Sequence, residues 1–222
     1  MIEGKFCVIG LGGFGENLVK ELIVQGAEVV AIDKDEKQLI KIKDIVSFAI
    51  SLDTTNENEM KKLGVKDVDT VIVAIGDSFE DSLVTTAILK NIGVKKIIAR
   101  VINPIHEKLL NALGVTDLLI PHVEIAAHLA RQLMMPGLIE VFSISDDYSI
   151  FEIKIPNWMI GRTVSEVELR QKYSLNIVTI KHENHKNKTS VMGTPVPSHI
   201  FEENDILVLF GKEKDFKKFN KE

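Results

Sequence analysis

The sequence predicts an α/β protein in which a doubly wound parallel sheet is followed by a smaller α+β domain. Two observations predict the sheet. Short β-branched runs alternate with helical periods up to about Leu133, and the first run leads into a glycine-rich turn. A third observation predicts the second domain, because paired strand-like runs replace this alternation after Pro136. We therefore expect one domain over residues 1–135 and another over residues 136–222.

Six strand-length apolar runs define the first domain, with amphipathic helical stretches between them. This alternation places helices on both faces of a parallel sheet, and right-handed crossovers then give a Rossmann-like order. Four helices end at a C′ glycine, namely Gly26, Gly64, Gly93 and Gly114. The expected strands are Phe6–Ile9, Glu28–Ile32, Ser47–Ile50, Val71–Ile75, Ile97–Val101 and Leu118–Ile120. The expected helices are Gly15–Gln25, Glu36–Lys43, Glu57–Leu63, Glu80–Asn91, Ile105–Leu113 and Glu124–Leu133.

The second domain opens with a predicted hairpin, in which Asp146-Asp147-Tyr148 forms the turn. Its remaining pattern mixes short helices with strands, which is typical of an α+β domain. The expected strands are Ile139–Ser145, Ser149–Ile155, Asn176–Lys181 and Ile206–Phe210, and the expected helices are Val164–Lys172 and Asp215–Asn220.

The glycine-rich turn has the spacing Gly10-x-Gly12-x-x-Gly15. Gly10 permits a tight turn, Gly12 lets the backbone approach a pyrophosphate, and Gly15 lets the helix pack closely on the strand. The free N–H groups and the positive dipole end of that helix favour phosphate. Asp33 ends the second strand and is placed to accept hydrogen bonds from a ribose 2′-hydroxyl. The pattern predicts a nucleotide site, since the alternative, a glycine-rich turn without a ligand, leaves Asp33 unexplained.

The composition excludes several classes of protein. The chain has 222 residues, 45% of them hydrophobic, and a net charge of −5 with acids and bases interspersed. We therefore expect a globular protein without the basic footprint of a nucleic-acid binder. The longest apolar runs are far too short to span a membrane, and we expect the N-terminal apolar run to be the first strand and not a signal peptide. Cys7 is the single cysteine, which fits a buried position in a cytoplasmic protein.

These residues resemble a known family, the RCK regulatory subunits of bacterial potassium uptake systems, known as the KtrA and TrkA group. The matching stretches of the first domain are VIGLGGFGENLVKEL, AIDKDE, SLDTTNENEMKKLGV, DTVIVAIGDSFEDS and IIARVINP. Those of the second are TVSEVELRQKYSLNIVTIKH and EENDILVLFG. The resemblance implies a nucleotide-binding TrkA-N domain followed by a TrkA-C domain. It also implies a homo-oligomer, at least a dimer and in its relatives an octameric ring, beneath a separate membrane potassium-translocating subunit.

The resemblance also implies which residues surround the nucleotide. Asp53 and Thr54 match positions beside the adenine, although Asp53 alone is more often a helix N-cap. Arg100 ends the fifth strand beside the phosphates, where a surface ion pair is the alternative role. The expected cofactor-binding residues are Gly10, Gly12, Gly13, Phe14, Gly15, Asp33, Lys34, Asp53, Thr54, Ala74, Ile75, Gly76, Arg100 and Glu124.

Two positions depart from the family pattern. Relatives often carry a basic residue where this chain has Gly13, and a carboxylate where His122 follows Pro121. Discrimination of ATP from ADP would then fall to Arg100, His122 and Glu124. We expect ATP or ADP as the nucleotide, with NAD(H) as the alternative because Asp33 suits any ribose with a free 2′-hydroxyl.

The second domain offers a separate expectation. Arg170 and Asn176 bracket a helix-to-strand turn, and in relatives the equivalent region forms a two-fold interface that can bind cyclic di-AMP. The alternative is that Arg170 caps the C-terminal end of its helix. His182 and His185 lie in a polar segment that we interpret as a solvated hairpin tip, so we expect no metal site.

No motif for a nucleophile or a general base is present in the sequence. We therefore expect a regulatory binding protein and not an enzyme, located at the cytoplasmic face of the membrane through its partner. The alternatives are a nicotinamide-dependent oxidoreductase and a nucleotide sensor that acts without a pore.

Overall fold

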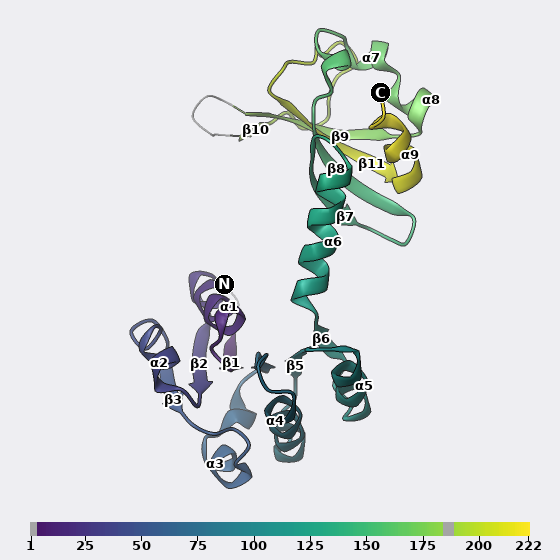
Figure 1. The fold of residues 1–222 in the computed structure, drawn as a ribbon. Coiled ribbons are helices and arrows are strands. Elements are labelled where there is room, and N and C mark those ends of the chain that lie inside the picture. Colours follow the sequence, from purple (N-terminus) through teal and green to yellow (C-terminus); the bar gives the residue numbers. More distant parts are fainter. Residues whose placement is uncertain (1–3, 184–188) are drawn as a thin grey trace. The chain divides into compact units, whose positions relative to one another are not determined.

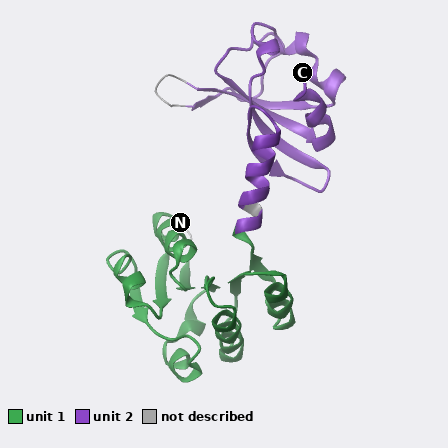
Figure 2. Cartoon of the chain, in the orientation of Figure 1, with its two compact units in different colours: residues 1–121 green, residues 122–222 purple. Residues whose placement is uncertain are grey.

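The computed structural model describes residues 4–183 and 189–222, apart from the side chain of Glu124. The described residues form two compact units, 1–121 and 122–222, which Figure 2 shows in separate colours. Each unit has its own sheet, as Figure 1 shows. The predicted combination of a doubly wound α/β fold and a smaller α+β fold is confirmed.

The sheet of the first unit is parallel and has the strand order β3-β2-β1-β4-β5-β6. This is the predicted Rossmann-like order, with its topological switch point between β1 and β4. The strands are β1 (Lys5–Ile9), β2 (Glu28–Asp33), β3 (Phe48–Ser51), β4 (Thr70–Val73), β5 (Ile97–Arg100) and β6 (Asp117–Leu119). The helices are α1 (Gly13–Val24), α2 (Glu36–Ile40), α3 (Glu57–Lys62), α4 (Phe79–Ile92) and α5 (Pro104–Ala112).

Two apolar clusters lie against the two faces of this sheet. Cys7 and Ile9 belong to a cluster that includes Leu89 of α4, whereas Val8 belongs to one that includes Val19 of α1. Successive residues of a strand point to opposite faces, so β1 is buried on both sides. This burial explains why the strands of the first domain are continuous apolar runs in the sequence.

The predicted C′ glycines all have positive φ, at Gly26 (86°), Gly64 (66°), Gly93 (86°) and Gly114 (77°). Since only glycine adopts this conformation without strain, these residues end their helices where the sequence predicts.

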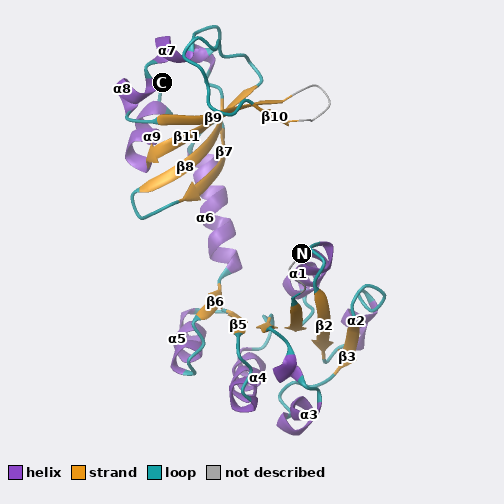
Figure 3. Ribbon diagram, turned by 180° about the vertical axis from the view of Figure 1, so that it is seen from behind, coloured by secondary structure: helices purple, strands orange, loops and turns teal. Residues whose placement is uncertain are grey.

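The second unit contains an antiparallel sheet with the order β10-β9-β11-β8-β7. Its strands are β7 (Leu138–Ser143), β8 (Tyr148–Lys154), β9 (Asn176–Glu183), β10 (Thr189–Val191) and β11 (Asp205–Lys212). Its helices are α6 (Pro121–Met134), α7 (Val164–Val167), α8 (Leu169–Tyr173) and α9 (Glu213–Phe219). Figure 3 colours these strands orange and the helices purple.

Three features of the second unit differ from the prediction. The helix predicted over residues 164–172 is broken into α7 and α8, because Glu168 adopts a left-handed conformation with φ of 50°. The short edge strand β10 was not predicted, since it has only three residues and a polar sequence. β9 extends to Glu183, so His182 lies in a strand and not in a solvated turn.

The contacts within the structure divide the chain at Pro121, the first residue of α6. The boundary predicted from the sequence, after residue 135, instead lies beyond the C-terminal end of this helix. Contacts with β7 explain the difference. Gln132 Nε2 donates a hydrogen bond of 2.6 Å to the carbonyl oxygen of Ile139, and His128 Nδ1 lies 3.2 Å from Glu140 Oε1. In sequence, α6 looks like the last helix of the βαβ series, so periodicity alone does not reveal which unit it joins.

Candidate nucleotide site

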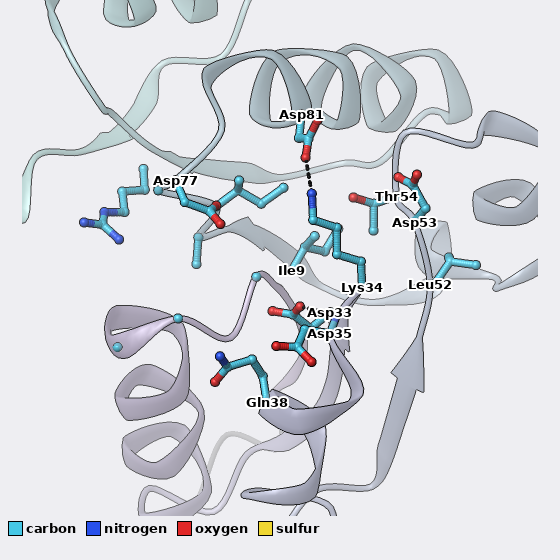
Figure 4. Close-up of a pocket in the computed structure, with 17 residues that line it drawn as sticks. Ile9, Asp33, Lys34, Asp35, Gln38, Leu52, Asp53, Thr54, Asp77 and Asp81 are labelled. Atoms are coloured by element: carbon cyan, nitrogen blue, oxygen red, sulfur yellow. Dashed lines mark hydrogen bonds and ion pairs between the residues drawn. The ribbon is translucent and has the colours of Figure 1, made fainter.

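A cleft of about 480 Å³ opens at the carboxyl ends of the strands in the first unit. Ligands of open α/β sheets bind at this edge, near the switch point. Figure 4 shows side chains from several loops pointing into the cleft. Most of the predicted site residues line it, namely Gly10, Gly12, Gly13, Asp33, Lys34, Asp53, Thr54, Ala74, Ile75, Gly76 and Arg100.

The glycine turn has the backbone geometry that its sequence requires. Gly10 has φ of 90°, and its N–H donates a 2.9 Å hydrogen bond to the carbonyl of Ile32. A β-carbon at Gly15 would collide with the carbonyl oxygen of Gly10, so only glycine lets α1 start this close to β1. Gly15 therefore acts through packing, behind the cleft wall.

Gly12 is the N-cap of α1 and has no side chain to accept from the first N–H groups of the helix. The first four amides of a helix lack partners within that helix. The space beside the α-carbons of Gly12 and Gly13 is open, with no atom within 4 Å of a hypothetical β-carbon. The cleft thus presents free backbone donors and a positive helix end, which can hold a phosphate without a basic side chain.

Asp33 connects the glycine turn to β2 through hydrogen bonds. Its Oδ2 accepts a 2.6 Å hydrogen bond from Leu11 N–H, and its Oδ1 accepts a 2.8 Å bond from Asp35 N–H. A carboxylate has about four acceptor sites, so two such bonds leave capacity for a ribose hydroxyl. Asp33 consequently shapes the glycine turn as well as facing the cleft.

Asp53 forms a local turn with Thr55, whose backbone N–H and hydroxyl both donate to Asp53 Oδ1, at 3.0 and 2.7 Å. These two bonds, with the hydroxyl contributing most, lower the pKa of Asp53. The alternative role as an N-cap is wrong, because Asn56 caps α3 by accepting from Asn58 and Glu59.

Thr54 forms the buried floor beside Asp53. Its Oγ1 lies 2.7 Å from Oγ1 of Thr85 on α4, and both side chains are almost fully buried. The hydroxyl pair connects the loop after β3 to α4. It therefore fixes the position of the Thr54 hydroxyl at the end of the cleft where the adenine is expected.

Arg100 ends β5 and lines the cleft beside Gly76. A β-carbon at Gly76 would meet the Arg100 guanidinium, which is the flexible end of its side chain and would have to move aside. The guanidinium carbon lies 5.6 Å from the centre of the Phe14 ring, in a cation–π contact. Phe14 thus supports Arg100 from outside the cleft lining. A cation beside the free amides of α1 suits an anionic ligand.

The cleft contains residues that the sequence did not single out: Ile9, Asp35, Gln38, Leu52, Asp77 and Asp81. Asp77 directly follows the predicted turn at Gly76, so extending the strand-end argument by a few residues finds it and Asp81. Gln38 and Leu52 carry no such signal. Glu124 belongs to α6 in the second unit, and its side chain lies outside the described residues.

The predicted residues of the second unit lie at the ends of one short segment. Arg170 is in α8 and Asn176 begins β9, and both are exposed. Among the described residues, neither side chain forms a hydrogen bond or an ion pair, so Arg170 is not seen capping its helix.

His182 Nδ1 lies 3.0 Å from the buried Asp205, and His185 lies outside the described residues. Within the described ranges, no cluster of metal-ligating side chains is found.

Known proteins match this chain over nearly its full length. Residues 6–121 match the TrkA-N domain, and residues 148–222 match the TrkA-C domain. The chain is 34% identical over 220 residues to Ktr system potassium uptake protein C of Bacillus subtilis strain 168, covering 99% of this chain and 97% of that protein. The chain belongs to the Ktr potassium uptake family. Protein A of the same system and strain is 32% identical over 218 residues, with 98% and 96% of the two chains covered.

Solved RCK structures share the fold of this Ktr family member. The crystal structure of the GsuK RCK domain aligns with a TM-score of 0.66 at 19% identity, covering 99% of this chain and 47% of that one. The GsuK channel bound to NAD aligns with a TM-score of 0.62 at 20% identity, covering 96% and 38%. The chain thus spans less than half of these polypeptides. Within residues 4–183 and 189–222, no helix has both the length and the apolar character needed to cross a bilayer.

Proposed function

We propose that the chain is a nucleotide-responsive regulatory subunit of a potassium uptake system. One observation carries this proposal: a glycine turn, free helix amides and Asp33 meet in one cleft of a chain that matches Ktr potassium uptake proteins end to end. Nucleotide occupancy of the cleft sets the conformation of the subunit, and that conformation opens or closes a separate membrane subunit. A ligand shifts such an equilibrium only by its difference in affinity for the two states.

The proposed ligands are ATP and ADP, held by the residues predicted from the sequence. The free amides of α1 and the Arg100 guanidinium take the phosphates, while Asp33 takes the ribose. The Thr54 end of the cleft then receives the adenine. NAD(H) remains the alternative ligand, since the GsuK channel has been solved with NAD.

We propose a homo-oligomer, a dimer at least and an octameric ring by resemblance, at the cytoplasmic face of the membrane. Ile125, Leu129 and Leu133 support this, because these apolar side chains of α6 are 67%, 52% and 74% exposed. Repeated apolar patches suit closed symmetric assemblies. Light scattering at micromolar concentration is expected to give a dimer or larger, and a monomer would contradict the assembly.

Regulation without catalysis is part of the proposal. The cleft contains carboxylates, amides, the Thr54 hydroxyl, the Lys34 ammonium and the Arg100 guanidinium, but no motif for a nucleophile or general base occurs in the sequence. We expect no change in absorbance at the wavelength of reduced nicotinamide when NADH and candidate substrates are added. Oxidation of NADH by the protein would instead support the oxidoreductase alternative.

The decisive experiment is potassium flux through the membrane subunit that co-purifies with this chain, reconstituted in vesicles. Flux is expected to differ between ATP and ADP. Arg100→Ala is expected to equalise the two nucleotides while assembly remains intact, because Arg100 lies at the proposed phosphate end. Each nucleotide favours one conformation over the other by its own free energy. A change of about 1.4 kcal/mol in the difference between the values for ATP and ADP shifts the open-to-closed ratio tenfold. Equal flux with both nucleotides in the unmutated protein would rule out an ATP/ADP switch.

A second ligand, cyclic di-AMP, is proposed for the second unit. The exposed, unengaged Arg170 and Asn176 at the ends of one turn favour this, because an arginine fork fits phosphate geometry. Calorimetry is expected to show binding that Arg170→Ala with Asn176→Ala abolishes. Binding that survives this double substitution would place the ligand elsewhere.

A further inference from the structure

An ion pair crosses the nucleotide cleft from one wall to the other. Lys34 directly follows β2, and its Nζ lies 2.7 Å from Oδ2 of Asp81 in the first turn of α4. β2 and β4, the strand before α4, lie on opposite sides of the switch point in the strand order. Figure 4 shows the Lys34 side chain extending through the cleft to meet Asp81. A nucleotide in this crevice therefore shares it with the ion pair.

The surroundings of Lys34 favour this crossing position. Asp81 contributes most to raising the pKa of Lys34, and Asp77 and Asp53 add to it. Asp53 lies in the loop after β3 and Asp77 in the loop after β4, whereas Asp81 lies in the first turn of α4. With Asp33 and Asp35 also in the lining, the cleft holds five carboxylates. The Lys34 ammonium offsets part of this negative charge, which would otherwise repel an anionic nucleotide.

The ion pair is only partly protected from solvent. The side chain of Lys34 is 61% exposed and that of Asp81 is 28% exposed. Exposed pairs contribute little to stability and are weakened by salt, so this one can open and close readily. Such a pair is better suited to timing the passage of a ligand than to setting the strength of binding.

We propose that Asp81 is a positioning residue of the nucleotide site, which holds Lys34 across the crevice as a clasp that must open for nucleotide to enter or leave. The inference rests on the proposed nucleotide-binding function. Asp81 acts through Lys34, and its position on α4 couples the clasp to the helix that Thr54 also contacts through Thr85. The clasp sets how long a nucleotide stays in the cleft.

Stopped-flow fluorescence with an N-methylanthraniloyl-labelled ADP and the full chain tests this. Asp81→Asn keeps the shape of the side chain but removes its charge. It is expected to raise both the association and dissociation rate constants about two- to fivefold, the range of an exposed ion pair, with a smaller change in Kd. Lys34→Met is expected to speed dissociation as well, and the double variant should dissociate no faster than the faster of the two single variants.

Two rescues separate the clasp from a structural role of Asp81 at the start of α4. Asp81→Glu keeps the charge, and the exchange of charges in Lys34→Asp with Asp81→Lys rebuilds the pair in reverse. Both are expected to restore slow dissociation. Raising the salt concentration should speed dissociation more from the unmutated protein than from Asp81→Asn, which has no ion pair left to screen. Glu57→Gln is the matched control, because Glu57 pairs with Lys61 at 2.9 Å on α3, away from the cleft lining.

The outcomes distinguish the clasp from the proposed function. Normal nucleotide binding with unchanged rate constants in Asp81→Asn would overturn the clasp and leave nucleotide binding intact. Additive effects of Lys34→Met and Asp81→Asn would also overturn it, because the two residues would then act separately. Failure of the unmutated protein to bind the labelled ADP, or unlabelled adenine nucleotides in calorimetry, would overturn both.

Discussion

In the first unit two apolar clusters lie against a parallel sheet, whereas in the second unit one aromatic-rich cluster lies against an antiparallel sheet. The parallel arrangement brings the loops after β1 to β5 to one edge, where their polar residues converge on the cleft. In the antiparallel sheet, successive strands end at opposite edges, so the loops do not gather in this way.

The two units concentrate their critical residues in different places. Substitutions in the second unit that matter most for folding fall in its aromatic core, which includes Phe151, Phe201, Phe216 and Phe219. In the first unit, critical residues also occur at the surface, because the glycine turn and Asp33 shape the cleft of the proposed nucleotide site.

Phe216→Ala is expected to destabilise the second unit by about 3–5 kcal/mol, because it leaves a large cavity. The ring is fully buried and stacks on Phe151 with centroids 4.0 Å apart. Urea denaturation measures the loss, and nucleotide binding by the first unit should persist. Phe142→Ala is the control, since that ring is 54% exposed and should cost little. Loss of nucleotide binding in Phe216→Ala would show that the first unit depends on the folding of the second.

Asp33→Ala is expected to weaken adenine nucleotide binding by about 1.5–3 kcal/mol, roughly tenfold to a hundredfold. This substitution removes the acceptor of the Leu11 N–H and the proposed acceptor of the ribose hydroxyl. Asp33→Asn keeps an acceptor for that N–H, so comparing the two variants by calorimetry separates loop support from ligand contact. Unchanged affinity in Asp33→Ala would remove Asp33 from the site.

Gly15→Ala and Gly13→Ala sharpen the comparison within one turn. The methyl group at Gly15 collides with the Gly10 carbonyl, and such overpacking costs about 1–3 kcal/mol. The methyl group at Gly13 meets no protein atom within 4 Å. Thermal unfolding should therefore report destabilisation for Gly15→Ala alone. Equal melting temperatures for the two variants would show that the turn tolerates either change.

Thr85→Val is expected to weaken nucleotide binding modestly, by about 0.5–1.5 kcal/mol, the net value of one hydrogen bond. Thr85 is fully buried, and its contact with the cleft runs through the hydroxyl of Thr54. Thr86→Val is the matched control, because its hydroxyl bonds to the Ser82 carbonyl within α4. Titration calorimetry should find reduced nucleotide affinity for Thr85→Val but not for Thr86→Val. Reduced affinity in Thr86→Val alone would show that the Thr54–Thr85 contact does not support the proposed adenine end of the cleft.

His106 gives the smallest expected effect, a dependence of stability on pH in the first unit. Burial lowers the pKa of His106 below its ordinary value of 6.5, while its Nδ1 accepts from the N–H of Ile102. As the pH falls, the His106 imidazole therefore binds a proton at a higher pH in the unfolded chain than in the folded one. The free energy of unfolding should fall as the pH drops below about 6.5, by at most about 1.4 kcal/mol per pH unit. Denaturation at several pH values should show a smaller dependence for His106→Asn.

The features that could be predicted from the amino-acid sequence are those that depend on neighbours along the chain. Continuous apolar strands, C′ glycines and the Gly10 to Gly15 turn are local patterns, and their physical requirements are fixed by backbone geometry. The strand-end rule then placed residues as distant as Asp33 and Arg100 at one edge, because parallel strands carry their carboxyl ends together.

Which of these residues contact one another depends on the folded structure. The break at Glu168 and the attachment of α6 to β7 depend on contacts that periodicity does not encode. The support of Arg100 by Phe14 and the pairing of Lys34 with Asp81 join segments far apart in sequence. Local propensity constrains one residue and its near neighbours, whereas a contact across the fold depends on how the elements pack, so it becomes visible only once the chain is folded.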